Sequence, residues 1–268
     1  MDRTKPPTED EQYEAYRQVA KLAQPHPVII RTLDIGGDKP ISYFQMAPEA
    51  NPFLGERGIR FCLARPEFFK TQLRAILRAA TSGKLKIMLP MVSTLEEVNK
   101  TRKLLVTCEQ ELAKAGMEYG TVELGVMIEL PAAALIGENL AEICSFFSIG
   151  TNDLTQYTLG VDRTNPKTAP LADYFHPAVL HLISITVRQA RKAGIMVGMC
   201  GEMAGDPVAA PLLIGLGLHE LSMAPMALPQ VRAMLSTYTM EECQSLAEKA
   251  ITCSSAQAVR ATMEAARR

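Results

Sequence analysis

Residues 146–163, which read FFSIGTNDLTQYTLGVDR, decide the fold of this chain. The apolar run Phe146–Ile149 stops at a glycine and predicts a buried strand. An amide and a carboxylate, Asn152 and Asp153, follow at once, and the guanidinium of Arg163 comes ten residues later. Parallel α/β folds place their chemistry at this end of a strand. The segment is therefore typical of an anion site beside a divalent cation, with simple capping of the next helix as the alternative.

Two further apolar runs end in reactive side chains. Residues 125–128 (GVMI) are too apolar for an edge strand, and Glu129 follows them. A carboxylate in that position is poorly solvated unless it meets a cation. Residues 195–200 (IMVGMC) end at Cys200, which Gly201 follows. Three strand ends of this kind, with helical stretches between them, predict an α/β fold.

Strands and helices alternate along the whole chain. A capping-box pattern, Thr8 and Glu11, begins the first helix. The patterns predict strands over residues 28–33, 85–90, 123–129, 146–150, 196–200 and 220–223, and helices near 8–22, 66–80, 95–115, 132–140, 154–159, 178–193, 207–215 and 228–267. Such alternation implies a parallel sheet with right-handed crossovers. Because reactive groups end strands throughout the 268 residues, a closed or nearly closed barrel fits better than an open sheet.

Composition excludes several classes of protein. The net charge is −1, with 28 basic and 29 acidic residues, which gives no electrostatic case for nucleic acid or an anionic membrane. Six cysteines are scattered singly, so neither a zinc cluster nor a disulfide framework is indicated. No apolar run approaches the roughly 18 residues of a membrane span, and the polar start is no signal peptide. The sequence predicts a cytoplasmic protein without membrane insertion.

Glu129 and Asp153 are candidate metal ligands. They are oxygen donors at the ends of successive predicted strands, without histidine or cysteine nearby. Hard oxygen ligands favour Mg²⁺ or Mn²⁺ over zinc. Helix capping and salt bridging by the two carboxylates remain the alternative.

Arg31, Arg57 and Arg163 follow strand or turn ends and are candidate anion ligands, because the planar guanidinium fork suits phosphate and carboxylate. Solvated surface arginines are the alternative. Lys39, which follows two glycines and an aspartate, is a weaker candidate for a phosphate contact, and a plain turn explains it equally well.

Cys200 could give or take a proton at carbon from a strand end, although a lone buried cysteine is usually a small apolar residue. His176 and His219 have no partners at informative spacing. Either could accept a phosphoryl group, but a surface or loop histidine is the preferred interpretation.

The chain resembles Enzyme I of the sugar phosphotransferase system. The resemblance lies in the segments RTLDIGGDKP, NPFLGERGIR, QLRAILRA, IMLPM, GVMIELPAA, FFSIGTNDLTQYTLGVDR and GMCGEMAGD, in that order over nearly the whole chain. It points to the C-terminal phosphoenolpyruvate-binding barrel, which that family shares in outline with pyruvate phosphate dikinase. The family's barrel binds phosphoenolpyruvate with Mg²⁺ and passes the phosphoryl group to a histidine on a separate domain, which then phosphorylates the carrier protein HPr.

The resemblance implies a role for each candidate residue. The implied phosphate ligands are Arg31 and Arg57, the metal ligands Glu129 and Asp153, the other substrate contacts Asn152, Asp153 and Arg163, and the acid that protonates the methylene carbon Cys200. Mg²⁺ and arginine would neutralise the charge on the phosphoryl group. A thiol kept protonated by an apolar setting would convert the enolate to pyruvate.

The chain departs from the family at its start. Met1-Asp2-Arg3 is similar to the end of the run Phe-Met-Asp-Arg that closes the family's first barrel strand, so Met1 resembles an internal methionine of a longer protein. We therefore expect one (β/α)8-type TIM barrel domain over residues 1–268 that lacks its first strand. Unpaired edges should then lie at residues 28–33 and 220–223. The family's phosphohistidine and HPr-binding domains are not expected within this sequence.

Two functions follow from the resemblance. The first is a phosphoenolpyruvate–protein phosphotransferase barrel that binds phosphoenolpyruvate and Mg²⁺, needs a histidine domain or HPr-like carrier in trans, and forms a homodimer. The second is a non-catalytic remnant that dimerises with a full-length Enzyme I-like protein and modulates it. A lyase or kinase on a similar barrel stays open, although its motifs would differ around Thr151–Asp153. Which sugar system is served does not follow from the sequence.

Overall fold

The computed structural model describes residues 5–36, 43–44 and 47–266. Met1-Asp2-Arg3 and Lys39, which the sequence singled out, lie outside these ranges. The chain divides into two compact units, Met1–Val126 and Met127–Arg268.

The first unit is built on parallel strands in chain order. β1 (Val28–Arg31) pairs with β2 (Leu85–Leu89), which pairs with β3 (Glu123–Ile128), whose last two residues belong to the second unit. The helical elements are α1 (Glu9–Ala23), η1 (Pro52–Leu54), α2 (Ile59–Ala64), α3 (Pro66–Ala79), η2 (Ala80–Ser82) and α4 (Leu95–Lys114).

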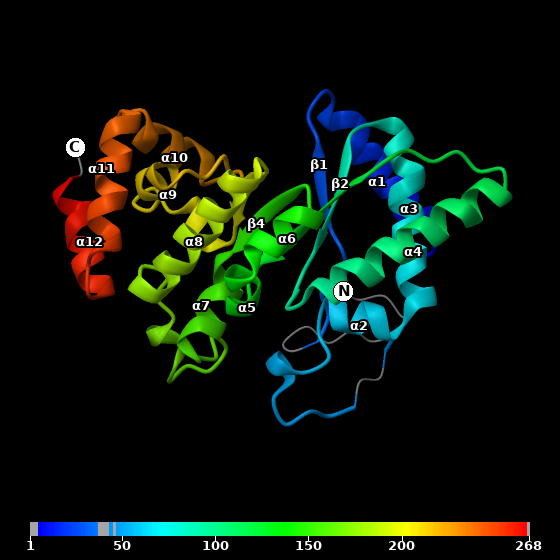
Figure 1. Ribbon diagram of the computed structural model, residues 1–268, viewed down its shortest axis with the longest axis horizontal. Helices are drawn as coiled ribbons and strands as arrows, with labels where there is room; N and C mark the ends of the chain where they lie inside the picture. The colour runs from blue at the N-terminus through cyan, green and yellow to red at the C-terminus, as the bar shows by residue number, and fades with distance from the viewer. Residues whose placement is uncertain (1–4, 37–42, 45–46, 267–268) are drawn as a thin grey trace. The chain divides into compact units, whose positions relative to one another are not determined.

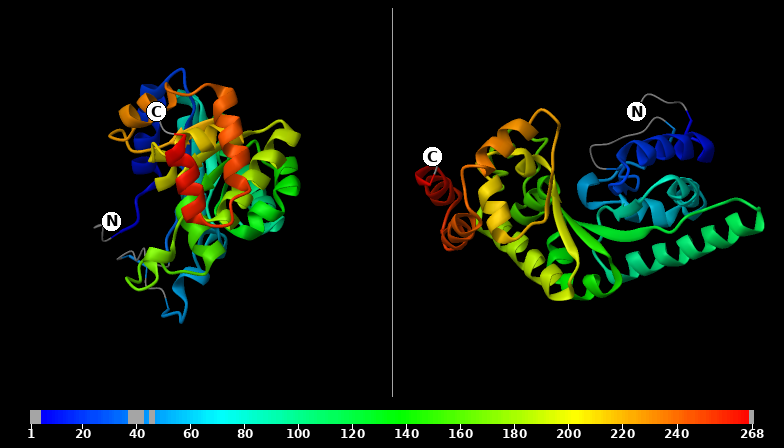
Figure 2. Two further views of the ribbon diagram at one scale, coloured as in Figure 1. Left: turned by 90° about the vertical axis from the view of Figure 1, so that its left-hand side faces the viewer. Right: turned by 90° about the horizontal axis from the view of Figure 1, so that it is seen from above.

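Ion pairs and apolar packing join the helices of the first unit. α1 begins with the predicted capping box, in which the Glu11 amide donates to Thr8 Oγ1 over 3.2 Å. α3 packs against both α1 and α4 (Figures 1 and 2). Glu9 of α1 pairs with Arg74 and Arg78 of α3 at 2.8 and 2.6 Å, which ties α1 to α3. The α3 face below these charges is apolar and buried.

The second unit has a parallel set of its own. β4 (Phe146–Gly150) pairs with β5 (Met196–Cys200) over five residues, and β5 pairs with β6 (Glu220–Ser222). The helical elements are α5 (Pro131–Leu135), α6 (Gly137–Ile143), α7 (Thr151–Leu159), η3 (Ala169–Leu171), α8 (Pro177–Ala193), η4 (Glu202–Gly205), α9 (Ala210–Leu216), α10 (Leu228–Leu235), α11 (Met240–Ile251) and α12 (Ala256–Ala265).

The C-terminal helices of the second unit are held by two different contacts. α9 lies so close to α11 that a Cβ on Gly215 would overlap the carbonyl oxygen of Cys243. α12 lies beside α11 (Figure 1) and carries Arg260, which donates to both carboxylate oxygens of Asp173 at 2.8 and 3.3 Å. The Arg260 guanidinium also lies 4.5 Å from the ring centroid of Phe175, so α12 is fastened to the segment before α8.

The fold class predicted from the sequence is confirmed: parallel strands alternate with helices, as in (β/α) barrels. All six predicted strands form, each starts at the predicted residue, and all end within two residues of the predicted end. Within the described residues, β1 pairs only with β2 and β6 only with β5, in agreement with the expected edges. Helix α2 was not predicted, because six residues between glycine and proline are too few to show a helical period. None of the helices in the described ranges has the length and apolar character that crossing a membrane requires.

Replacement of Gly215 by alanine tests the close packing of α9 on α11. We expect Gly215→Ala to destabilise the protein by about 1–2 kcal/mol, because overpacking of backbone against a side chain outweighs the higher helix propensity of alanine. Urea unfolding measures the change. Gly205→Ala is the matched control, since its Cβ would meet only ordinary contacts at 3.4 Å. Stabilisation by Gly215→Ala would show that helix propensity alone decides at this position.

Candidate active site

A pocket opens at the carboxyl ends of the strands in the second unit. Cys200 is the last residue of β5 and pairs in register with Gly150, the last residue of β4. The chain passes from Gly150 directly into α7, which brings Asn152 to the same edge. Asn152 and Cys200 line a pocket of about 530 Å³ together with Glu202, Asp206 and Ser222 among others. Two predicted site residues from different strand ends thus share one cavity.

Hydrogen bonds hold Asn152 in a defined orientation. The Glu202 amide donates to Asn152 Oδ1 over 3.0 Å, so the side-chain NH₂ group of Asn152 points elsewhere. Because Asn152 lines the pocket, its NH₂ group is the donor that this side chain can offer to a bound molecule. Thr151 Oγ1 is buried and has no hydrogen-bond partner in the described part of the chain. A buried polar atom in this state points to a bound water or ligand.

The segment after β5 is fixed from two sides. Asp206 accepts from the Tyr174 hydroxyl and from the Val208 amide, both over 2.8 Å. Burial raises the pKa of the Tyr174 phenol and the bond to Asp206 raises it further, so Tyr174 donates as a neutral hydroxyl. Since Asp206 lines the pocket, Tyr174 helps to shape it.

Asp153 and Arg163, two of the predicted site residues, form an ion pair. Asp153 lies in the first turn of α7 and is buried, and its Oδ2 lies 3.3 Å from Arg163 Nη1. The Arg163 amide donates to the buried side chain of Gln156 over 3.1 Å, which ties the turn after α7 to the helix. A carboxylate and a guanidinium are therefore held together at a helix N-terminus, where an anion is favoured.

Glu129 lies beside the end of β4. It follows β3 directly and is 1% exposed. A Cβ on Gly150 would stand 3.0 Å from the Cβ of Glu129, so glycine is needed for this approach. A buried carboxylate is costly unless it is compensated, which makes Glu129 and Asp153 a suitable donor set for a hard cation.

These two carboxylates fit Mg²⁺. The described residues contain no group of three or more His, Cys, Asp or Glu side chains able to hold a metal. Mg²⁺ is commonly bound by one or two carboxylates, with water and substrate phosphate as its other ligands. The buried oxygens of Glu129 and Asp153 match that pattern, whereas zinc would call for nitrogen or sulfur.

The first unit contains a separate cluster of charges. Arg31 ends β1, and its Nη1 lies 3.0 Å from Asp34 Oδ2. Arg57 is fully buried and donates to both oxygens of Asp34 over 3.2 Å. Asp34 therefore joins two predicted phosphate ligands, a role that the sequence analysis missed. The three-residue spacing of Arg31 and Asp34 in the sequence could have indicated this ion pair.

The predicted site residues thus form two clusters. Asp34 gathers the two arginines of the first unit, and the second unit contains the other five predicted residues: Glu129, Asn152, Asp153, Arg163 and Cys200. The two histidines that the sequence singled out, His176 and His219, are exposed, as the interpretation of surface or loop histidines predicts. His176 caps α8 by accepting from the Ala178 amide over 3.2 Å, and the Val197 amide lies 3.2 Å from His219 Nδ1.

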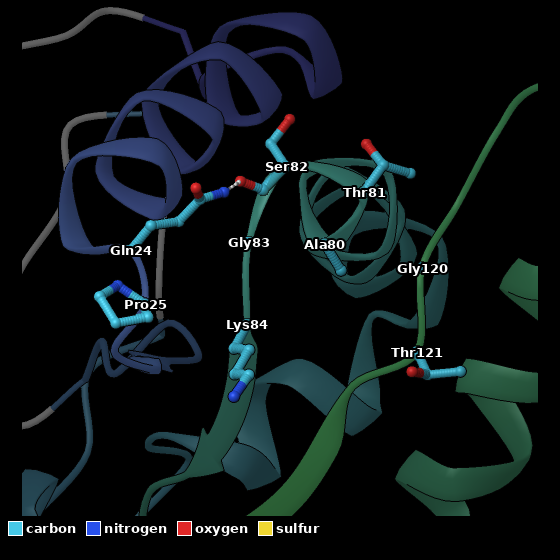
Figure 3. A pocket seen from close by; sticks show the side chains of 9 residues that line it. All are labelled: Gln24, Pro25, Ala80, Thr81, Ser82, Gly83, Lys84, Gly120 and Thr121. Carbon is cyan, nitrogen blue, oxygen red and sulfur yellow. Dashed lines mark hydrogen bonds between the residues drawn. The ribbon is translucent and has the colours of Figure 1, made fainter.

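A second hollow lies at the opposite, amino ends of the strands in the first unit. It has a volume of about 820 Å³ and is lined by surface residues that include Gln24, Lys84 and Thr121 (Figure 3). Gln24 Nε2 donates to the Ser82 carbonyl over 2.7 Å at its rim. None of the predicted site residues lines it, and in folds of this class the amino ends of the strands serve stability.

Known proteins resemble the chain over most of its length. Residues 1–240 match the family described as PEP-utilising enzyme, PEP-binding domain. Over 260 residues the chain is 46% identical to the phosphoenolpyruvate-protein phosphotransferase of Bacillus subtilis (strain 168) and 48% identical to the multiphosphoryl transfer protein of Rhodobacter capsulatus. The matched part is 97% of this chain but 46% and 31% of these relatives, so the chain spans half or less of their length.

Among solved structures, a citrate lyase from Burkholderia xenovorans LB400 is 18% identical, with a TM-score of 0.48 over 73% of this chain and 66% of that chain. That likeness carries no argument about function. The family is shown by the match over residues 1–240 and by the identity to the curated relatives. The chain belongs to the PEP-utilising enzymes and corresponds to their PEP-binding domain.

Proposed function

We propose that this chain binds phosphoenolpyruvate with Mg²⁺ and supports transfer of the phosphoryl group to a histidine of a separate domain, as a phosphoenolpyruvate–protein phosphotransferase. The observation that carries the proposal is the pocket that Asn152 and Cys200 share at the carboxyl ends of β4 and β5. It supplies an amide donor and a thiol for one small molecule. The identity of 46% to a relative with that activity in its name supports the same assignment.

The arginines of the two clusters are the proposed anion ligands. Phosphoenolpyruvate is a small anion with a phosphate and a carboxylate, and guanidinium forks suit both groups. The proposed phosphate ligands are Arg31 and Arg57, and the further substrate ligands are Arg163 and the NH₂ group of Asn152. Asp34 and Asp153 hold three of these donors in place.

Glu129 and Asp153 would hold the metal ion. When bound, Mg²⁺ supplies positive charge next to the phosphate and so favours its transfer. The protein's own contribution is to keep the two carboxylates buried and close to the end of β4.

The chemistry then falls into two steps. The bond between phosphorus and the enol oxygen breaks, and the histidine nitrogen of the other domain takes the phosphoryl group. The enolate of pyruvate remains, and the Cys200 thiol gives its proton to the methylene carbon to form pyruvate. The thiolate left behind regains a proton from solvent, which returns the site to its starting state.

Partners in this proposal are a phosphohistidine domain or an HPr-like carrier in trans, in the cytoplasm. We also propose a homodimer, as the resemblance to Enzyme I implies. Sedimentation velocity at micromolar concentration distinguishes a dimer from a monomer, and a monomer alone would contradict this part.

Loss of either metal ligand should abolish binding of phosphoenolpyruvate. We expect Glu129→Ala and Asp153→Ala to remove the heat of binding in calorimetry with phosphoenolpyruvate and Mg²⁺, because each change removes one of two carboxylates. Glu138→Ala is the control, since Glu138 is exposed and pairs only at the surface with Lys192. Unchanged binding in Glu129→Ala would sink the assignment of the metal site.

Asp34→Asn tests the cluster of the first unit. The neutral amide no longer compensates Arg57, and breaking a buried ion pair typically costs about 3–5 kcal/mol of stability. We expect a loss of that order in urea unfolding and weaker binding of phosphoenolpyruvate in calorimetry, because the arginines lose their anchor.

Asp173→Asn is the matched control for Asp34→Asn, because its partner Arg260 is 45% exposed. Such surface pairs contribute at most about 1 kcal/mol. If the two variants lose equal stability, burial of the Asp34–Arg57 pair has no special effect.

Cys200→Ala should separate binding from turnover. We expect phosphoenolpyruvate to bind with nearly unchanged affinity, while pyruvate formation is lost when a histidine domain is supplied as a separate chain. Lactate dehydrogenase coupling measures the pyruvate, and Cys253→Ala is the control. Normal turnover in Cys200→Ala would show that the thiol only packs against its neighbours and is not the proton donor. Binding without any turnover in the unaltered protein would favour the non-catalytic alternative.

A further inference from the structure

We propose that Ser148 is a positioning residue for the Cys200 thiol and that its hydroxyl stabilises the thiolate left after proton donation. The Ser148 hydroxyl donates to Cys200 Sγ over 3.2 Å. This inference rests on the proposed function, in which Cys200 protonates the enolate. The contact itself is a property of β4 and β5 alone.

The register of the two strands explains why these side chains meet. Ser148 pairs with Gly198 and Gly150 pairs with Cys200. Residues two apart on a strand point to the same face, so Cys200 lies on the same face as Gly198, which is the pairing partner of Ser148. Neither direct partner, Gly198 nor Gly150, has a side chain, which leaves the diagonal between Ser148 and Cys200 open.

Burial makes the contact selective. Ser148 is 7% exposed, whereas Cys200 is partly exposed and lines the pocket. The hydroxyl therefore approaches the sulfur from the core while the reactant approaches from the pocket. A serine hydroxyl can donate one hydrogen bond, and here the acceptor is the Cys200 sulfur.

The charge on sulfur decides what this bond contributes. A hydrogen bond to an ionised acceptor is roughly twice as strong as one between neutral groups. The Ser148 bond therefore strengthens when Cys200 loses its proton, and it favours proton transfer toward the methylene carbon. No atom of Ser148 is consumed, because the proton that the carbon gains comes from the thiol.

The other thiols of the chain provide internal references. Burial raises the pKa of the Cys62 and Cys108 thiols to about 12, so both stay protonated near neutral pH. Cys144 and Cys243 are also buried. Cys253 is partly exposed and lies on α11's C-terminal side, with its sulfur near Thr262 rather than near a strand. It reports general changes in reactivity within the same sample.

The test is the rate at which iodoacetamide alkylates Cys200 in the full chain, followed by mass spectrometry of the Cys200 and Cys253 peptides. Ser148→Ala should slow alkylation of Cys200 about tenfold, the usual weight of one hydrogen bond to a charged group. Cys253 should react at its normal rate. Ser148→Thr keeps the hydroxyl and should restore most of the rate, and Ser236→Ala, at a distant serine, should change nothing.

A normal Cys200 rate in Ser148→Ala overturns the inference. Where the alanine variant does not fold, the comparison of Ser148→Val with Ser148→Thr carries the same test, because the two side chains have nearly the same shape and only threonine has the hydroxyl. A second readout, pyruvate formation with a histidine domain in trans, should show a lower kcat in Ser148→Ala at an unchanged KM for phosphoenolpyruvate. A raised KM for phosphoenolpyruvate with a normal kcat would also contradict the inference.

The two proposals fail in different ways. If alkylation slows in Ser148→Ala while Cys200→Ala still forms pyruvate, the thiol is not the acid and the proposed function loses that step. The stabilisation of the thiolate by Ser148 would stand. If Cys200→Ala abolishes turnover and Ser148→Ala changes neither rate, the proposed function stands and the role of Ser148 is overturned.

Discussion

Parallel pairing of neighbouring strands is the constraint on which the rest of this protein depends. A parallel neighbour can be reached only by a crossover, so each strand must be followed by helical segments before the next begins. All carboxyl ends then meet at one edge of each strand set. In the second unit the five-residue register between β4 and β5 fixes which side chains share that edge. The location of the pocket follows from strand pairing and not from any single loop.

Charge burial is the second organising feature. Asp34 lies between two guanidiniums, and Asp153 lies beside a third, so these two buried acids each meet a cation within their own unit. Under the proposed function, these arginines are ordered before phosphoenolpyruvate arrives, which lowers the entropy lost on binding. Under the same proposal, an entering anion shares each arginine with the acid that already holds it.

The strands and the residues that stand at their ends were predictable from the sequence, because both are encoded in short local patterns. The apolar run before Gly150 and the one before Glu129 defined their strands, and the reactive residues stood next in line. Contacts between segments were not predictable in the same way. The pairing of Arg57 with Asp34 spans 23 residues and that of Ser148 with Cys200 spans 52, and no local period records such distances. Helix α2 was missed for the opposite reason, since it is too short to have a period at all.

The attachment of α12 has a consequence for the wall of the pocket. Arg260 donates to Asp173 and lies over the ring of Phe175, and the residue between these two, Tyr174, donates to Asp206 in the pocket wall. α12 lies beyond residue 240, where the family match ends. The orientation of Tyr174 therefore depends on a helix that the family match does not include, and a substitution at Arg260 would reach the pocket wall through three consecutive residues.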